Sequence, residues 1–128
     1  MSETSQSTTT PANEKHIGSC HCGKVRYEVT GKFDSGITCN CSICSRTGAI
    51  LTFVPVEQFK LVSGEDQLTD YQFNKMRLHH FFCKTCGVRS FASGNGPDGK
   101  EMRAINMRCL ENFDFEAVPT KQYNGKAS

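Results

Sequence analysis

The chain lacks the segments that would insert it into a membrane or carry it through one. It contains no run of 18 apolar residues, so no transmembrane helix is expected. Residues 1–15 are rich in serine and threonine and contain neither an apolar core segment nor an arginine, which fits no secretory signal and no typical transit peptide. We expect residues 1–15 to form a disordered tail and residues 16–128 to form a single domain.

Excess charge of either sign is also missing. The sequence has 15 lysines and arginines against 13 acidic residues, which gives a formal net charge of +2. No basic stripe interleaved with aromatic residues is present, so no nucleic-acid partner is expected.

Helical periodicity is the third absence. No segment of ten or more residues repeats its apolar positions every 3.6 residues, whereas several short runs alternate or are rich in strand-forming residues. The sequence therefore predicts a small, mostly β domain with only short helical turns. The expected strands are 25–29, 50–54, 60–62, 68–73, 75–82, 88–91 and 101–107, with helical turns at 42–47 and 56–59, an exposed loop at 92–99 and a polar segment at 111–128 anchored by Phe113, Phe115 and Val118.

Cysteine, by contrast, is abundant, with eight residues in 128. The cysteines form pairs spaced C-x-C and C-x-x-C in a chain without a secretory signal, and this pattern favours metal binding over disulfide bonds. Thiolates at such short spacing converge on a soft metal ion, usually zinc. The implied compartment is reducing, so we expect the protein in the cytoplasm or the nucleus.

Two short motifs of similar sequence predict a structural zinc site. Cys20 and Cys22 are followed by Gly23, and Cys83 and Cys86 are followed by Gly87. A glycine at this position permits positive φ, so that backbone N–H groups turn toward the sulfur atoms. The four thiolates complete a tetrahedral site, and metal binding would close a loop of about sixty residues.

The remaining cluster consists of Cys39, Cys41 and Cys44. Three ligands leave one position of a tetrahedral ion open for water or substrate, which is typical of catalytic zinc. Cys109, His79 and His80 are alternative fourth ligands. A lone cysteine is more often a buried apolar residue and a strand histidine is more often packed, so the pattern favours an open position.

The ordered cysteine motifs resemble the glutathione-dependent formaldehyde-activating enzyme family, which also includes centromere protein V. The motifs are C-x-C-G, then C-x-C-x-x-C followed by a basic residue and glycine, then F-C-x-x-C-G, within residues 17–110. The resemblance implies several coiled antiparallel β-sheets, a structural zinc on the four-cysteine set and a catalytic zinc on the three-cysteine set. It also implies carbon–sulfur lyase chemistry on glutathione adducts, with S-hydroxymethylglutathione formation as the named activity.

The chain departs from the family pattern at three places. Many relatives have histidine where this chain has Asn40, the basic pair after the third cysteine is here Ser45-Arg46, and the last strand ends Asn106-Met107-Arg108-Cys109. These departures suggest a carbon electrophile other than formaldehyde.

Glutathione carries two carboxylates, so a cation near the three-cysteine set would orient it. Arg46, two residues after Cys44, is the first candidate and Arg108 the second. His79, His80 and Tyr71 have suitable acid–base chemistry. The alternative function is a zinc-stapled β module that binds a protein or nucleic acid without catalysis. Alkylation distinguishes the two, because an open thiolate cluster should react faster than a closed four-cysteine site.

Overall fold

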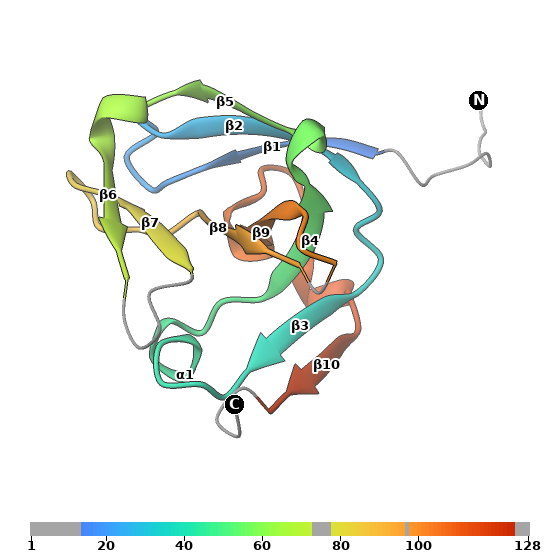
Figure 1. The fold of residues 1–128 in the computed structure, drawn as a ribbon. Coiled ribbons are helices and arrows are strands. Elements are labelled where there is room, and N and C mark those ends of the chain that lie inside the picture. The colour runs from blue at the N-terminus through green and yellow to red at the C-terminus, as the bar shows by residue number, and fades with distance from the viewer. Residues whose placement is uncertain (1–13, 73–77, 97, 125–128) are drawn as a thin grey trace, which may run out of the picture.

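The computed structural model describes residues 14–72, 78–96 and 98–124. Within these residues, ten strands form two sheets, and the helical structure consists of one short α-helix and four single 3-10 turns (Figure 1). The prediction of a mostly β domain with short helical turns is therefore confirmed. The helical elements are α1 (Cys44–Thr47), η3 (Val56–Gln58), η4 (Glu65–Gln67), η5 (Met107–Cys109) and η6 (Phe115–Ala117).

The smaller sheet has the antiparallel order β1-β2-β5 and lies across one end of the larger sheet (Figure 1). The larger sheet has the order β10-β3-β4-β9-β8-β7-β6 and is antiparallel except for the β10–β3 pair. The strands of the smaller sheet are β1 (Glu14–Ser19), β2 (Arg26–Gly31) and β5 (Phe59–Ser63). Those of the larger sheet are β3 (Gly36–Cys39), β4 (Leu51–Pro55), β6 (Leu68–Tyr71), β7 (His79–Cys83), β8 (Phe91–Asn95), β9 (Glu101–Asn106) and β10 (Thr120–Tyr123).

The expected hairpin over residues 68–82 is present as β6 and β7, which pair with Leu68 opposite Cys83 and Tyr71 opposite His80. Residues 73–77, which include the expected turn and parts of both predicted strands, lie outside the described residues. The pairing places the end of β7 at the second cysteine motif. Strand β1 begins at Glu14, so the last two residues of the expected tail belong to a sheet.

Two sequence predictions in the C-terminal half were wrong. Residues 88–90 are not a strand, and the predicted loop at 92–99 begins with β8, in which Ala92 and Ser93 are buried. Small residues covered on both faces give no apolar alternation, so the pattern resembled a loop. The predicted polar segment contains β10, whose four residues are all exposed, while Phe113, Phe115 and Val118 pack against the core as expected.

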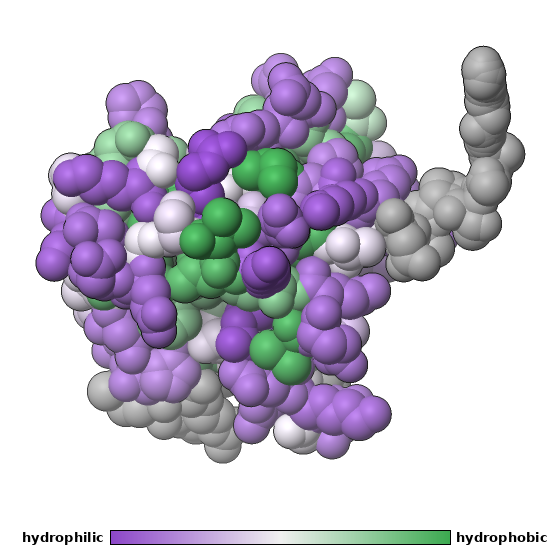
Figure 2. Space-filling model, turned by 90° about the horizontal axis from the view of Figure 1, so that it is seen from above, coloured by the Kyte–Doolittle hydropathy of each residue, from purple (hydrophilic) through white to green (hydrophobic). Residues whose placement is uncertain are grey.

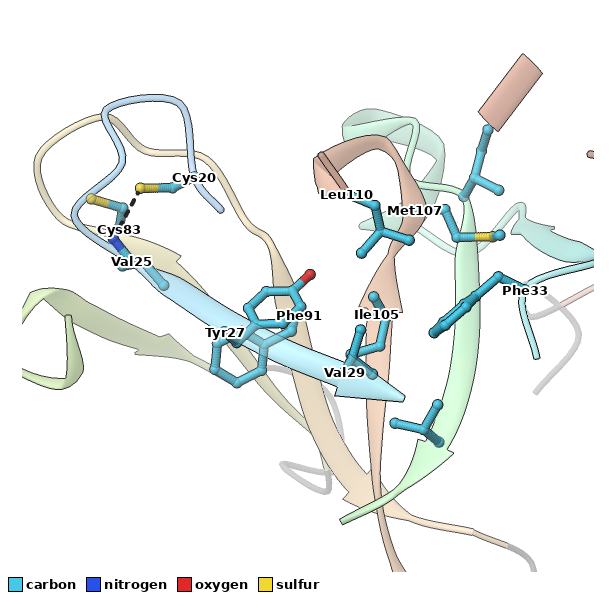
Figure 3. Close-up of a cluster of buried hydrophobic side chains, with 12 residues drawn as sticks. Cys20, Val25, Tyr27, Val29, Phe33, Cys83, Phe91, Ile105, Met107 and Leu110 are labelled. Atoms are coloured by element: carbon cyan, nitrogen blue, oxygen red, sulfur yellow. Dashed lines mark hydrogen bonds between the residues drawn. The ribbon is translucent and has the colours of Figure 1, made fainter. Parts of the chain in front are cut away.

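The core forms where β2 packs against β8 and β9. Tyr27 is fully buried beside Phe91, and Val29 lies near Ile105 (Figure 3). The Tyr27 hydroxyl donates a hydrogen bond of 2.9 Å to the carbonyl of Ser90, so the polar end of this side chain is satisfied. Cys20 and Cys83 close one end of the same cluster, which makes the first cysteine set part of the core (Figure 3).

Apolar surface is scattered. The face seen from above in Figure 1, which the smaller sheet covers, is mainly hydrophilic with small separate apolar patches (Figure 2). Among the described residues, the large apolar side chains that are most exposed lie on β4, β5, β6 and β10 and just before β7: Phe53, Val62, Tyr71, Tyr123 and Leu78. Single exposed apolar residues of this kind are ordinary and do not define a docking face.

Gly18 tests the packing around Tyr27. A Cβ atom at position 18 would lie within hard overlap of the Tyr27 ring, which has no room to move because it is fully buried. Gly18→Ala is therefore expected to lower the free energy of unfolding by about 2–3 kcal/mol, as measured by urea denaturation. Lys15→Ala in the same strand removes an exposed ion pair with Glu28 and should change stability by less than about 0.5 kcal/mol. Equal midpoints for the two variants would contradict this packing.

Candidate metal centres

The first cysteine set is assembled from two turns whose nearest cysteines, Cys22 and Cys83, are 61 residues apart in the sequence. The turn after β1 supplies Cys20 and Cys22, and the turn after β7 supplies Cys83 and Cys86; the four sulfur atoms all lie within 4.8 Å of one another. The Sγ–Sγ distances are 3.7 Å for Cys20–Cys22 and 3.7 Å for Cys22–Cys83. A tetrahedral zinc with Zn–S bonds of about 2.3 Å requires sulfur atoms about 3.8 Å apart, whereas a disulfide requires about 2.05 Å. The four donors thus fit a metal ion such as zinc.

The backbone of both turns favours thiolates. Gly23 and Gly87 have φ values of 83° and 80°, the left-handed conformation that the sequence predicted. The Val25 N–H donates to the Cys20 sulfur and the Thr85 N–H to the Cys83 sulfur, both at 3.4 Å.

The pKa values differ within this set. The Lys24 N–H favours the Cys22 thiolate, but desolvation and the neighbouring thiols outweigh it and raise the pKa of Cys22 to about 11. Burial opposes ionisation of Cys86, but backbone N–H groups of Val88 and Cys22 and the thiols of Cys20 and Cys83 lower its pKa to about 6. A thiolate is therefore available at neutral pH for metal binding.

The second cysteine set lies where β3 ends and α1 begins. The sulfur atoms of Cys39, Cys41 and Cys44 lie within 4.8 Å of one another. Backbone N–H groups again turn toward sulfur, since Cys41 donates to the Cys39 sulfur and Cys44 to the Cys41 sulfur, each at 3.4 Å. Gly48 caps α1 in the left-handed conformation, with its N–H bonded to the Cys44 carbonyl at 3.0 Å. The predicted helical turn and its terminating glycine are confirmed.

The three sulfur atoms differ in their readiness to ionise. Burial opposes ionisation of Cys41, but N–H groups of Cys44 and Ile43 and the neighbouring thiols outweigh it and lower the pKa. Cys44 is buried, and burial followed by the nearby Cys41 and Cys39 raises its pKa to about 12. Sulfur atoms this close compete for charge, and a bound cation would relieve that competition.

No further Cys, His, Asp or Glu of the described residues joins the second set. Cys109 lies instead beside the first set: burial, then the charges of Cys20 and Cys86, raise its pKa to about 11. The alternative in which Cys109 completes the second site therefore has no support. His79 Nδ1 forms a hydrogen bond of 2.7 Å with the Asp70 carboxylate, and His80 contacts Arg89.

Two adjoining hollows open beside α1. The first has a volume of about 400 Å³ and the second about 290 Å³, and they share Ile43 and Tyr71. Ser42 and Arg46 complete the lining of the first hollow; the second is also lined by Thr47, His80, Phe82 and Arg89. Space for a small ligand thus lies against the helix that carries Cys44.

The two arginines expected near the site occupy different environments. Arg46 lines the first hollow and donates a hydrogen bond of 2.7 Å to the Ser42 carbonyl. Arg108 donates to the Gly48 carbonyl at 3.0 Å and lies over the Phe115 ring at 4.8 Å. Arg108 therefore braces the end of α1, while Arg46 faces space that a ligand can fill.

The sequence analysis missed Arg89. Its guanidinium lines the second hollow and donates to His80 Nδ1 at 2.5 Å and to Thr47 Oγ1 at 3.4 Å. Both cysteine motifs are followed by Val-Arg, and this repeat could have drawn attention to it. The equivalent Arg26 pairs with Glu111 at 2.9 Å, whereas Arg89 has no ion pair with a carboxylate among the described residues.

His80 is expected to remain neutral throughout the physiological range. Burial, followed by the charge of Arg89 and of His79, lowers its pKa to about 4, although Asp70 opposes the shift. The unfolded value is about 6.5, so above that pH His80 is neutral in both states and the stability of the fold is complete. As the pH falls toward 4, the unfolded chain binds a proton on this histidine that the folded protein does not, and the free energy of unfolding decreases by on the order of 2 kcal/mol.

Imidazole chemical shifts measured by NMR during a pH titration of the folded protein check this expectation. Arg89→Gln should raise the pKa of His80, because it removes the adjacent positive charge. Titration of His80 near pH 6.5 in the unsubstituted protein would contradict the environment described here.

No helix in the part of the chain that the structure describes is both long and apolar enough to cross a membrane.

Comparison with known proteins agrees with the cysteine pattern. The family model described as "Glutathione-dependent formaldehyde-activating enzyme" matches residues 15–125. A crystal structure of a Rhodobacter sphaeroides protein is similar, with 33% sequence identity, a TM-score of 0.72, and coverage of 82% of this chain and 99% of that one. The chain therefore belongs to the glutathione-dependent formaldehyde-activating enzyme family.

Proposed function

We propose that the protein is a zinc-dependent carbon–sulfur lyase that forms or cleaves adducts between glutathione and a carbonyl compound. The observation that carries this proposal is the three-cysteine set, which has no fourth protein ligand among the described residues and which ends at Cys44, the first residue of the helix that borders two open hollows. A metal site with an open position beside ligand-sized space is the arrangement that zinc chemistry requires. Family membership supports the same class of reaction.

The two cysteine sets have different roles in this proposal. Cys20, Cys22, Cys83 and Cys86 would hold a structural zinc, since four sulfur donors leave no open position and two of them are buried in the core. Cys39, Cys41 and Cys44 would hold the catalytic zinc. When bound there, zinc supplies positive charge that keeps a substrate thiol deprotonated. Because seven thiolates must stay reduced, we place the protein in the cytoplasm.

Residues of the first hollow are suited to hold glutathione. Arg46 donates one N–H group to the Ser42 carbonyl and has no ion pair with a carboxylate in the described residues. Its other N–H donors are therefore available to a carboxylate of glutathione. Tyr71 borders both hollows and is half-exposed, which lets its hydroxyl approach a ligand in either. Of the candidate acid–base groups, Tyr71 and His80 line the hollows, while His79 pairs with Asp70.

Native mass spectrometry of the zinc-loaded protein, titrated with glutathione, tests the proposal. We expect two zinc ions per chain and a one-to-one glutathione complex at millimolar concentration, weakened about tenfold by Arg46→Gln. Arg103→Gln is a matched control, because Arg103 pairs with Glu101 away from both hollows. Two zinc ions without glutathione binding would exclude glutathione as the substrate and favour a binding module.

A further inference from the structure

The second hollow has features that glutathione does not require. It shares Ile43 and Tyr71 with the first hollow, but Arg89 lines it where Arg46 lines the first. Its volume of about 290 Å³ far exceeds the needs of formaldehyde, whose two heavy atoms fill on the order of 50 Å³ when scaled from a water molecule at about 30 Å³. The space accommodates a larger electrophile.

Arg89 gives this hollow its chemical character. The guanidinium has five N–H donors, and in the described residues it donates one to His80 and one to Thr47. His80 is buried and accepts through Nδ1, so it fixes the guanidinium without neutralising its charge. Ile43 and Phe82 add apolar walls. A fixed cation without a carboxylate partner, set among apolar side chains, suits a small organic anion.

The position of Arg89 relative to the cysteines indicates which carboxylate it meets. Its hydrogen bond to Thr47 places it against α1, since Thr47 is three residues after Cys44 on the same helix. In glutathione, six or more covalent bonds separate the sulfur from either carboxylate. In a 2-oxo acid, the carboxylate is attached directly to the carbon that the sulfur attacks.

We propose that the second hollow binds an electrophile that itself bears a carboxylate, a small 2-oxo acid, and that Arg89 holds this carboxylate. The inference rests on the proposed glutathione chemistry. In the addition step, the thiolate sulfur forms a bond to the carbonyl carbon and the C=O π electron pair moves to oxygen. That oxygen takes up a proton equivalent to the one the thiol lost, so no oxidant or reductant is needed. The reverse step returns the thiol and the oxo acid.

The test compares glyoxylate with methylglyoxal, an aldehyde of similar size without a carboxylate. The rate of hemithioacetal formation with glutathione, above the uncatalysed rate, is measured by NMR exchange for the zinc-loaded full chain. Arg89→Gln should reduce the ratio of kcat/KM for glyoxylate to kcat/KM for methylglyoxal by about 10–100-fold. Arg89→Lys should reduce this ratio by less, because lysine keeps the positive charge but lacks the paired N–H donors of the guanidinium. Arg46→Gln should leave this ratio unchanged.

Two further arms separate the other outcomes. If Arg89 instead held the glycine carboxylate of glutathione, Arg89→Gln would lower kcat/KM equally for both aldehydes. That decrease would disappear when the glycine ethyl ester of glutathione replaced glutathione. This result overturns the proposal. If no aldehyde reacts faster than without protein, the proposed function fails. Titration with glycolate then decides the hollow alone: chemical-shift changes at the backbone N–H groups of Ile43 and Phe82, which line it, support carboxylate binding if Arg89→Gln abolishes them, and their absence in the unsubstituted protein overturns it.

Discussion

Cys83→Ser is expected to abolish cooperative folding under conditions in which the unsubstituted protein is folded. Cys83 is fully buried, ends β7 and belongs to the core as well as to the four-sulfur set. Structural zinc in comparable sites contributes about 10–16 kcal/mol, which is comparable to the total stability of an ordinary domain at about 5–15 kcal/mol. The variant should bind one zinc fewer and lose its thermal transition, as measured by metal analysis and circular dichroism. Prolonged treatment of the unsubstituted protein with a strong chelator should have the same effect.

Cys109→Ser provides the matched control for this prediction. Cys109 lies beside the same cluster, and its sulfur is 4.0 Å from the Arg89 carbonyl, but it is not one of the four converging sulfur atoms. Its replacement should cost about 1 kcal/mol and leave the zinc content unchanged. A Cys83→Ser protein that retained its thermal transition would show that the core, and not the metal, holds the two sheets together.

The sequence predicted the elements that carry regular alternation or cysteine motifs. Strand β2 could be recognised because its buried residues recur at every second position, the β6–β7 pair because β7 ends at the second cysteine motif, and α1 because Gly48 ends it. Strand β8 could not, since Ala92, Ser93 and Gly94 are small and carry no hydrophobic pattern. Strand β10 is held by backbone pairing with β3. Its side chains are all exposed, so its sequence carries no apolar pattern from which a strand could be predicted.

The candidate site divides in the same way. Cysteine spacing predicted both sets of sulfur atoms, because ligands close in sequence must converge on one ion. Arg89 depends on tertiary structure: it becomes part of the site only when the turn after β7 packs against Thr47 of α1. Arg26 follows a similar motif and is also preceded by valine, but it pairs with Glu111. Local sequence therefore did not distinguish a structural arginine from one that faces a hollow.

Cys41→Ser is expected to remove catalysis while the fold remains. Cys41 is half-buried in the loop between β3 and α1, outside the core cluster, so its replacement leaves the two sheets intact. Loss of one of three thiolates should reduce the zinc content from two ions to one and lower kcat/KM for glutathione adduct formation by roughly a thousandfold or more. The thermal transition should shift by only a few degrees.

Comparison of the two cysteine variants makes this prediction specific. If both sets were structural, Cys41→Ser would lose its thermal transition as Cys83→Ser does. If the three-cysteine set held no functional ion, Cys41→Ser would keep the activity of the Cys109→Ser control. The four-sulfur set joins turns about sixty residues apart, whereas the three-sulfur set spans only six residues. If the first set stabilises the fold and the second holds the catalytic ion, Cys41→Ser is a folded protein with one zinc and without catalysis, and neither of the other two cases gives that result.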